Sequence, residues 1–107
     1  MEMKWEITPQ ELKQRLDAGD ELQLIDVRTP EEFAIANIGG MLLPVSDLLM
    51  RHHELNPDKE TVVICHHGIR SAQAAVLLSQ LGFSQVLSLR GGLERWSNEV
   101  DPSLPRY

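Results

Sequence analysis

Short apolar runs alternate with helix-forming stretches along the sequence, and this alternation restricts the chain to few folds. The clearest apolar run is residues 61–65, Thr-Val-Val-Ile-Cys, and the Ala- and Leu-rich residues 71–81 follow it. An apolar, β-branched run of this length is typical of a central strand that is covered on both faces. Strands that alternate with helices need crossover connections, which make neighbouring strands parallel. The sequence therefore predicts an α/β fold with a mainly parallel sheet between helices.

Two capping boxes predict where further helices begin. In each, a threonine can accept a hydrogen bond from the first helical N–H groups, a proline occupies the first helical position, and a glutamate can reach back. One box starts at Thr8, with its helix ending near Gly19, and the other starts at Thr29. The remaining expected elements are strands at residues 22–27, 41–43 and 86–89, and helices from Ser46 to about Leu55 and from Leu93 to about Val100.

The charge balance of the chain argues against several classes of partner. Sixteen Asp and Glu against ten Lys and Arg give a net charge of −6, which is unfavourable for nucleic-acid binding and for a polybasic membrane contact. No apolar run approaches the roughly 20 residues of a membrane span, and residues 1–5 lack the long apolar region of a secretory signal. From 107 residues that are 42% hydrophobic, we expect one domain over residues 1–107, as a monomer or weak dimer.

The chain has one cysteine, Cys65, at the end of the apolar run 61–65. A lone cysteine cannot form an internal disulfide, and it fits a reducing compartment such as the cytoplasm. The commonest role of an isolated free cysteine is that of a small buried hydrophobic residue. The position of Cys65 favours another role, because sites in parallel sheets form beyond the carboxyl ends of the strands.

The loop after Cys65 has the composition of an anion-binding cup. It reads Cys65-His66-His67-Gly68-Ile69-Arg70-Ser71. The short spacing from Cys65 to Arg70 forces the chain to curl, and Gly68 can adopt the positive φ that a tight curl needs. The N–H groups of such a loop point inward, and the following helix adds the positive end of its dipole. We expect the cup to stabilise a nucleophilic thiolate on Cys65, and Arg70 to hold an anionic substrate in a bidentate manner.

Three segments spread over nearly the whole chain together resemble rhodanese-like sulfurtransferases. Cys65-x-x-Gly68-x-Arg70-Ser71 resembles the active-site loop of that family. The second segment is similar to the family's D-V-R-x-x-x-E-[FY] stretch and reads Asp26-Val27-Arg28 with Glu32-Phe33. The third is similar to the family's G-G-x-x-x-W stretch and reads Gly91-Gly92 with Trp96.

The resemblance implies a three-layer α/β/α fold around a five-stranded, mainly parallel sheet. Cys65 is then the catalytic residue: it accepts sulfane sulfur as a persulfide from thiosulfate or a similar small anion, and passes it to a thiophilic acceptor such as cyanide, a thiol or a protein. The residues implied to bind substrate, through backbone amides that cradle the sulfur, are His66, His67, Gly68, Ile69, Arg70 and Ser71. No cysteine–histidine cluster has the spacing of a zinc site, and Gly91-Gly92 lacks the pattern of a dinucleotide-binding motif, so we expect neither a metal nor a cofactor.

One departure from the usual pattern and one more particular resemblance bear on substrate and partner. The family's G-H-I-P-G-A stretch is replaced by Ala-Asn-Ile-Gly-Gly-Met at residues 36–41, which we expect to border the mouth of the site and to alter substrate preference. His66-His67 and the tail from Trp96 resemble rhodanese domains fused to enzymes that activate ubiquitin-like sulfur carriers. The alternative function is therefore a sulfur-relay or regulatory binding module that acts with a cysteine desulfurase or a sulfur-carrier protein, with little thiosulfate turnover.

Several residues keep two interpretations. His66 and His67 can add positive charge near an anion, or their backbone amides alone can matter. Asp26 and Arg28 are expected to support the site, more often by fixing neighbouring loops than by contacting substrate. A cysteine phosphatase uses a similar cup, but its loop is one residue longer between Cys and Arg, which disfavours that activity here. His52-His53 reads as solvated helix surface, Gly91-Gly92 as a turn and Trp96 as core.

Overall fold

Five parallel strands form one sheet in the computed structural model, which describes residues 4–107. The strand order is β1 (Glu6–Ile7), β5 (Val86–Leu89), β4 (Thr61–Ile64), β2 (Gln23–Asp26) and β3 (Met41–Leu42). The central pair is β4 with β2, in which Val63 lies opposite Ile25 and Ile64 opposite Asp26. The prediction of a five-stranded parallel α/β sheet is confirmed. The prediction that residues 1–5 are not a secretory signal falls partly on residues 1–3, which lie outside the described residues.

Four of the five helices connect these strands as crossovers, and the fifth follows β5. They are α1 (Pro9–Asp17), α2 (Pro30–Ile35), α3 (Val45–Arg51) with a following 3-10 turn (His52–Glu54), α4 (Ile69–Gln80) and α5 (Gly92–Glu99). Both capping boxes form: Thr8 and Glu11 cap α1, and Thr29 and Glu32 cap α2. Within residues 4–107, no helix is long and apolar enough to cross a membrane.

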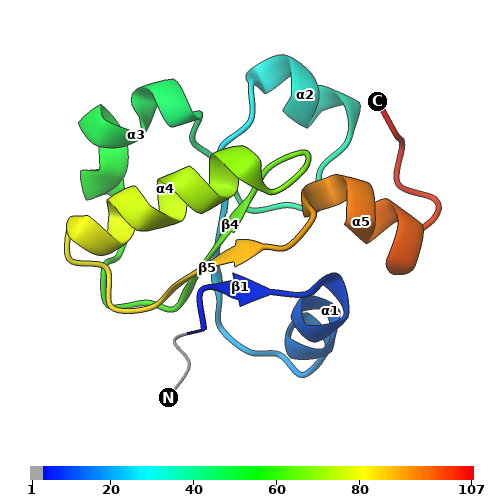
Figure 1. Ribbon diagram of the computed structural model, residues 1–107, viewed down its shortest axis with the longest axis horizontal. Coiled ribbons are helices and arrows are strands. Elements are labelled where there is room, and N and C mark those ends of the chain that lie inside the picture. The colour runs from blue at the N-terminus through cyan, green and yellow to red at the C-terminus, as the bar shows by residue number, and fades with distance from the viewer. Residues whose placement is uncertain (1–3) are drawn as a thin grey trace.

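Helices cover both faces of the sheet, with α3 and α4 on one side and α1 with α5 on the other (Figure 1). Alternate residues of β4 separate the two cores. Val63 packs with Leu48 of α3 and Leu78 of α4, whereas Val62 and Ile64 pack with α1 and α5. Strand β4 is buried on both faces and apolar after Thr61, as the sequence analysis expected of a central strand.

Four details of the sequence-based elements are corrected. Helix α3 begins at Val45, directly after Pro44, so Ser46 lies in its first turn and does not cap it. The helix ends at Arg51, and the chain reaches Leu55 through the 3-10 turn. Strand β4 ends at Ile64, so Cys65 is the first residue of the loop. Helix α4 begins at Ile69 rather than at Ser71, because Gly68, at a φ of +95°, completes the curl of the loop early.

A buried ion pair ties the end of β2 to its surroundings. Arg28 is fully buried and pairs with Asp26 through Nε–Oδ1 (2.9 Å) and Nη2–Oδ2 (2.7 Å). Its remaining N–H groups donate to the carbonyl oxygens of Glu32 (3.3 Å) and Ala36 (2.6 Å) and to the hydroxyl oxygen of Tyr107 (2.7 Å). One guanidinium therefore connects the carboxyl end of β2, the helix α2 and the side chain of Tyr107.

We expect Arg28→Met to lower the free energy of unfolding by about 3–5 kcal/mol, because the substitution leaves the Asp26 carboxylate buried without a cation. Urea unfolding of the variant against the wild type measures this loss. The matched control is Arg51→Met, which removes an arginine paired with Glu54 on the exposed surface, and little change is expected there. Equal losses in the two variants would contradict the assignment.

Candidate active site

The carboxyl ends of β2, β4 and β5 meet at one edge of the sheet, and the predicted site residues lie there. Cys65 follows β4, Arg28 follows β2, and the Gly91-Gly92 turn follows β5. This is the edge at which parallel α/β sheets form their sites.

The sulfur of Cys65 is held by backbone N–H groups of its own loop. The amide of Gly68 lies 3.0 Å and that of Ser71 lies 3.3 Å from Sγ. The first is brought there by the positive φ of Gly68, and the second belongs to the first turn of α4. Cys65 is only 1% exposed. Two N–H donors and the N-terminus of α4 are thus directed at one sulfur, which is the arrangement that the sequence analysis expected of this loop.

A pair of buried hydroxyl groups extends this network into the sheet. Ser71 Oγ lies 3.3 Å from Cys65 Sγ and 2.7 Å from Ser88 Oγ of β5. Both serines are fully buried. Sequence reasoning did not select Ser88, although a single polar residue inside the otherwise apolar strand Val86–Leu89 was an available signal.

The first turn of α5 orients the peptide groups of the loop. The amides of Leu93 and Glu94 donate to the carbonyl oxygens of Cys65 (2.9 Å) and His66 (3.0 Å). With these carbonyls engaged by α5, the loop can present N–H groups to the sulfur. The close approach requires glycine at position 92, because a Cβ atom there would lie 2.4 Å from both carbonyl oxygens.

Arg70 is part of an ion pair at the rim of the loop. Its Nη1 and Nη2 atoms lie 2.6 Å and 2.9 Å from the two carboxylate oxygens of Glu32. The guanidinium holds the pKa of Glu32 well below its usual range, so this carboxylate is charged at neutral pH. Bidentate binding of a substrate by Arg70 requires this pair to open, and that role of Arg70 stays a prediction. Glu32 was recognised from the sequence as a capping residue and a motif match, but not as a site residue.

Three aromatic rings stack beside the loop. The His66 ring lies between those of His67 (centroids 3.9 Å apart) and Tyr107 (4.0 Å), and the Tyr107 hydroxyl donates to Glu32 (2.9 Å). Burial lowers the pKa of His66 below its ordinary value, so its ring is largely neutral at pH 7. Of the remaining loop residues, Ile69 has an exposed side chain. Tyr107 was missed as a site residue.

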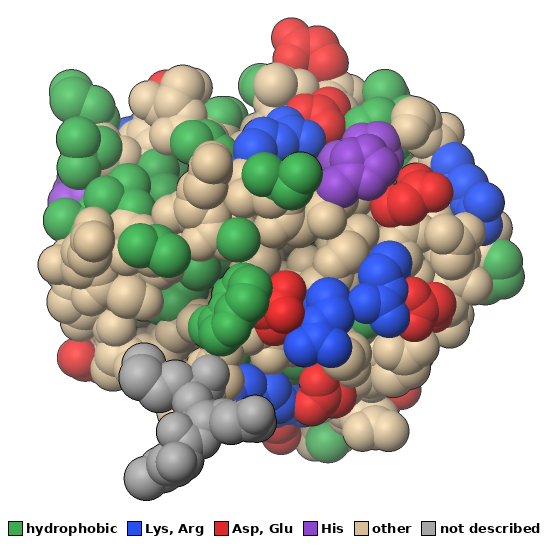
Figure 2. All heavy atoms as spheres, viewed as in Figure 1, with side chains coloured by type: hydrophobic (Ala, Val, Ile, Leu, Met, Phe, Trp, Pro, Cys, Tyr) green, Lys and Arg blue, Asp and Glu red, His purple; other side chains and the backbone are tan. Residues whose placement is uncertain are grey.

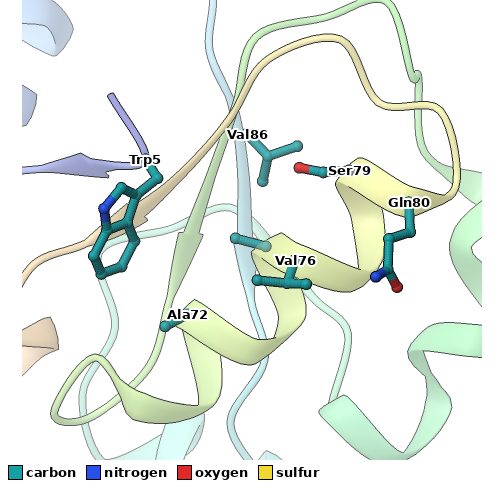
Figure 3. A pocket seen from close by; sticks show the side chains of 7 residues that line it. Trp5, Ala72, Val76, Ser79, Gln80 and Val86 are labelled. Atoms are coloured by element: carbon teal, nitrogen blue, oxygen red, sulfur yellow. The ribbon is translucent and has the colours of Figure 1, made fainter. Parts of the chain in front are cut away.

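Other features singled out in the sequence lie apart from Cys65. His52 and His53 lie in the 3-10 turn after α3. Trp96 belongs to α5, and its side chain packs in the core. In the described part of the chain, no group of three or more His, Cys, Asp or Glu could hold a metal ion. An apolar pocket of about 320 Å³ lies between Trp5, α4 and β5, and its lining contains neither Cys65 nor a charged side chain (Figure 3).

A buried cysteine that follows a parallel strand, with amides of its own loop directed at the sulfur, places the chain among α/β proteins with a cysteine loop at the carboxyl ends of the strands. The sequence-family model of the rhodanese-like domain matches residues 8–99 of the chain. The chain belongs to the rhodanese-like domain family.

Similar proteins agree with this assignment. The chain is 40% identical over 98 residues to a sulfurtransferase of Allochromatium vinosum, covering 91% of this chain and 92% of that protein. It is 38% identical over 104 residues to the probable adenylyltransferase/sulfurtransferase MoeZ of Mycobacterium tuberculosis, covering 94% of this chain but only 26% of that protein. Among solved structures, a rhodanese-related protein from Thermoplasma volcanium superposes with a TM-score of 0.81 at 34% identity, covering 90% of this chain and 93% of the other.

We expect Gly92→Ala to displace the loop and abolish the reactivity of Cys65, because the new methyl group collides with the carbonyl groups of Cys65 and His66. The rate of Cys65 alkylation by iodoacetamide, measured on the folded variant, checks this.

Gly19→Ala is the matched control. Gly19 also has a positive φ (+82°), but a Cβ atom there meets nothing within 4 Å. We therefore expect Gly19→Ala to lower the free energy of unfolding by roughly 1–2 kcal/mol, through left-handed backbone strain alone. The rate of Cys65 alkylation in this variant is expected to equal that of the wild type. A wild-type alkylation rate in folded Gly92→Ala would show that α5 does not set the geometry of the loop.

Proposed function

We propose that this protein is a sulfurtransferase that carries sulfane sulfur as a persulfide on Cys65. The Cys65 thiolate attacks the outer sulfur of thiosulfate, the S–S bond of the donor breaks, and sulfite leaves with the electron pair. Attack of a thiophilic acceptor such as cyanide on the outer sulfur of the persulfide then releases thiocyanate and restores the thiolate. Atoms and charge balance in both steps, and neither a metal nor a cofactor enters.

The observation that carries this proposal is the contact of two backbone amides with Cys65 Sγ. In the proposed reaction these donors stabilise the thiolate that attacks and the persulfide anion that forms. The names of the relatives point the same way: besides the Allochromatium vinosum sulfurtransferase, a thiosulfate sulfurtransferase of Pseudomonas aeruginosa is 36% identical over 94 residues. A reactive lone thiol fits a reducing compartment, and we propose the cytoplasm as its location.

The test is the intact mass of the protein after incubation with thiosulfate, and again after addition of cyanide. The wild type is expected to gain one sulfur atom and then to lose it as thiocyanate. Cys65→Ser, which keeps the size of the side chain but lacks the sulfur nucleophile, is expected to gain nothing. Sulfur transfer at wild-type rate by folded Cys65→Ser would overturn the proposal.

A second candidate is a sulfur relay in which a partner protein loads Cys65. The pairing of Arg70 with Glu32 favours this candidate, because it leaves the rim of the loop without a free arginine fork for a small anion. The names of two relatives are consistent with it, since one is the adenylyltransferase/sulfurtransferase MoeZ and another, YrkF of Bacillus subtilis, includes "sulfur carrier protein".

The rate of persulfide formation distinguishes the two candidates. Under the relay, a cysteine desulfurase with cysteine loads Cys65 faster than thiosulfate does at equal donor concentration. Equal or slower loading by the desulfurase would count against the relay and leave the thiosulfate reaction as the function.

A further inference from the structure

We propose that Glu32 is a specificity-determining residue that disfavours doubly charged sulfur donors by neutralising Arg70 at the rim of the Cys65 loop. This inference rests on the proposed sulfur transfer and names the class of donor that the site prefers: a donor with a single negative charge or none.

The first support is the geometry of the ion pair. The planar fork of Arg70 is the part of an arginine that binds sulfonate-like and carboxylate groups in a bidentate manner. Here both of its terminal nitrogens contact the carboxylate of Glu32, at 2.6 Å and 2.9 Å. The Glu32 side chain is only 19% exposed and that of Arg70 is 36% exposed, so water screens the pair only partly.

The second support is that the Glu32 carboxylate is fixed in place. Its oxygens also accept hydrogen bonds from the Thr29 amide (3.2 Å) and from the Tyr107 hydroxyl (2.9 Å). The Tyr107 hydroxyl is in turn held by Arg28 (2.7 Å). The negative charge is thus anchored by α2, the buried Arg28 and the last residue of the chain.

The third support is the charge of the surroundings. The neighbouring His66 ring is largely neutral at pH 7, and the carboxylate of Glu94 lies 3.6 Å from its Nε2 atom. On the face shown in Figure 2, acidic and basic side chains are interspersed, and no large area is uniformly basic. Attraction for an anion then comes mainly from the backbone amides around Cys65.

The consequence for donors follows from Coulomb's law. At about 6 Å in a water-like dielectric, one unit charge changes the binding of another by a factor of about three. Because the energy is proportional to the charge of the donor, the factor for a dianion is the square of the factor for a monoanion. Removing the charge of Glu32 should therefore improve the binding of a dianion by about tenfold and that of a monoanion by about threefold.

The experiment compares two donors in Glu32→Gln, with cyanide as the acceptor. Thiosulfate is the dianion. Methanethiosulfonate is the monoanion, and it transfers its outer sulfur to the Cys65 thiolate while methanesulfinate leaves. Glutamine also serves in capping boxes, so α2 keeps its cap. We expect KM to fall about tenfold for thiosulfate and about threefold for methanethiosulfonate, with kcat changing less than KM for both donors.

Two further variants complete the design. Glu31→Gln removes the same charge from an exposed neighbour on α2, and its KM values are expected to change by less than twofold for either donor. In Glu32→Gln/Arg70→Gln the gain for thiosulfate is expected to disappear, because the liberated cation is gone. Equal factors for the two donors, no change in Glu32→Gln, or the same change in Glu31→Gln would each overturn the inference.

The wild type provides a measurement that does not depend on folding of a variant. Its KM is expected to be higher for thiosulfate than for methanethiosulfonate, and the opposite order contradicts the inference. If the wild type takes sulfur from neither donor, the proposed function fails. If it uses both donors without the charge-dependent difference, only the role of Glu32 fails.

Discussion

The hydrogen bonds from the first turn of α5 to the carbonyl oxygens of Cys65 and His66 are the contacts on which the candidate site depends. A peptide group that directs its carbonyl toward α5 cannot also direct it toward the sulfur. The helix after β5 therefore determines which polar groups the loop after β4 presents. Gly92 allows the two backbones to approach this closely, which explains a glycine at the start of a helix.

A second layer of contacts surrounds the loop and is electrostatic. Asp26 and Arg28 are fully buried and bond to each other, and Arg28 extends to α2 and to Tyr107. Tyr107 then contacts Glu32, which pairs with Arg70 at the start of α4. The chain of contacts runs from the interior of the sheet to the rim of the loop. It gives the expected supporting residues Asp26 and Arg28 a structural connection to the site without contact with the sulfur.

Features that depend on neighbours in the sequence could be predicted. The capping boxes at Thr8 and Thr29 and the positive φ of Gly68 follow from residues within a few positions of each other. The two-residue strand β1 was missed, because so short a segment shows no alternation.

Contacts between distant residues could not be found in the same way. Glu32 lies 38 positions from Arg70 and 75 from Tyr107, and a single sequence does not indicate that they meet. The capping motif explained Glu32 locally and concealed its second role. Arg70 was expected to face a substrate because the sequence does not indicate that its partner in the fold is Glu32.

The way in which α5 holds the loop has an entropic consequence. The backbone of residues 65–71 is held by hydrogen bonds to α5 and by the start of α4. In the proposed reaction, an anionic donor would therefore meet N–H dipoles that need little reorganisation, because the loop is ordered on folding. A flexible loop of the same composition would lose part of its binding free energy to that ordering at each turnover.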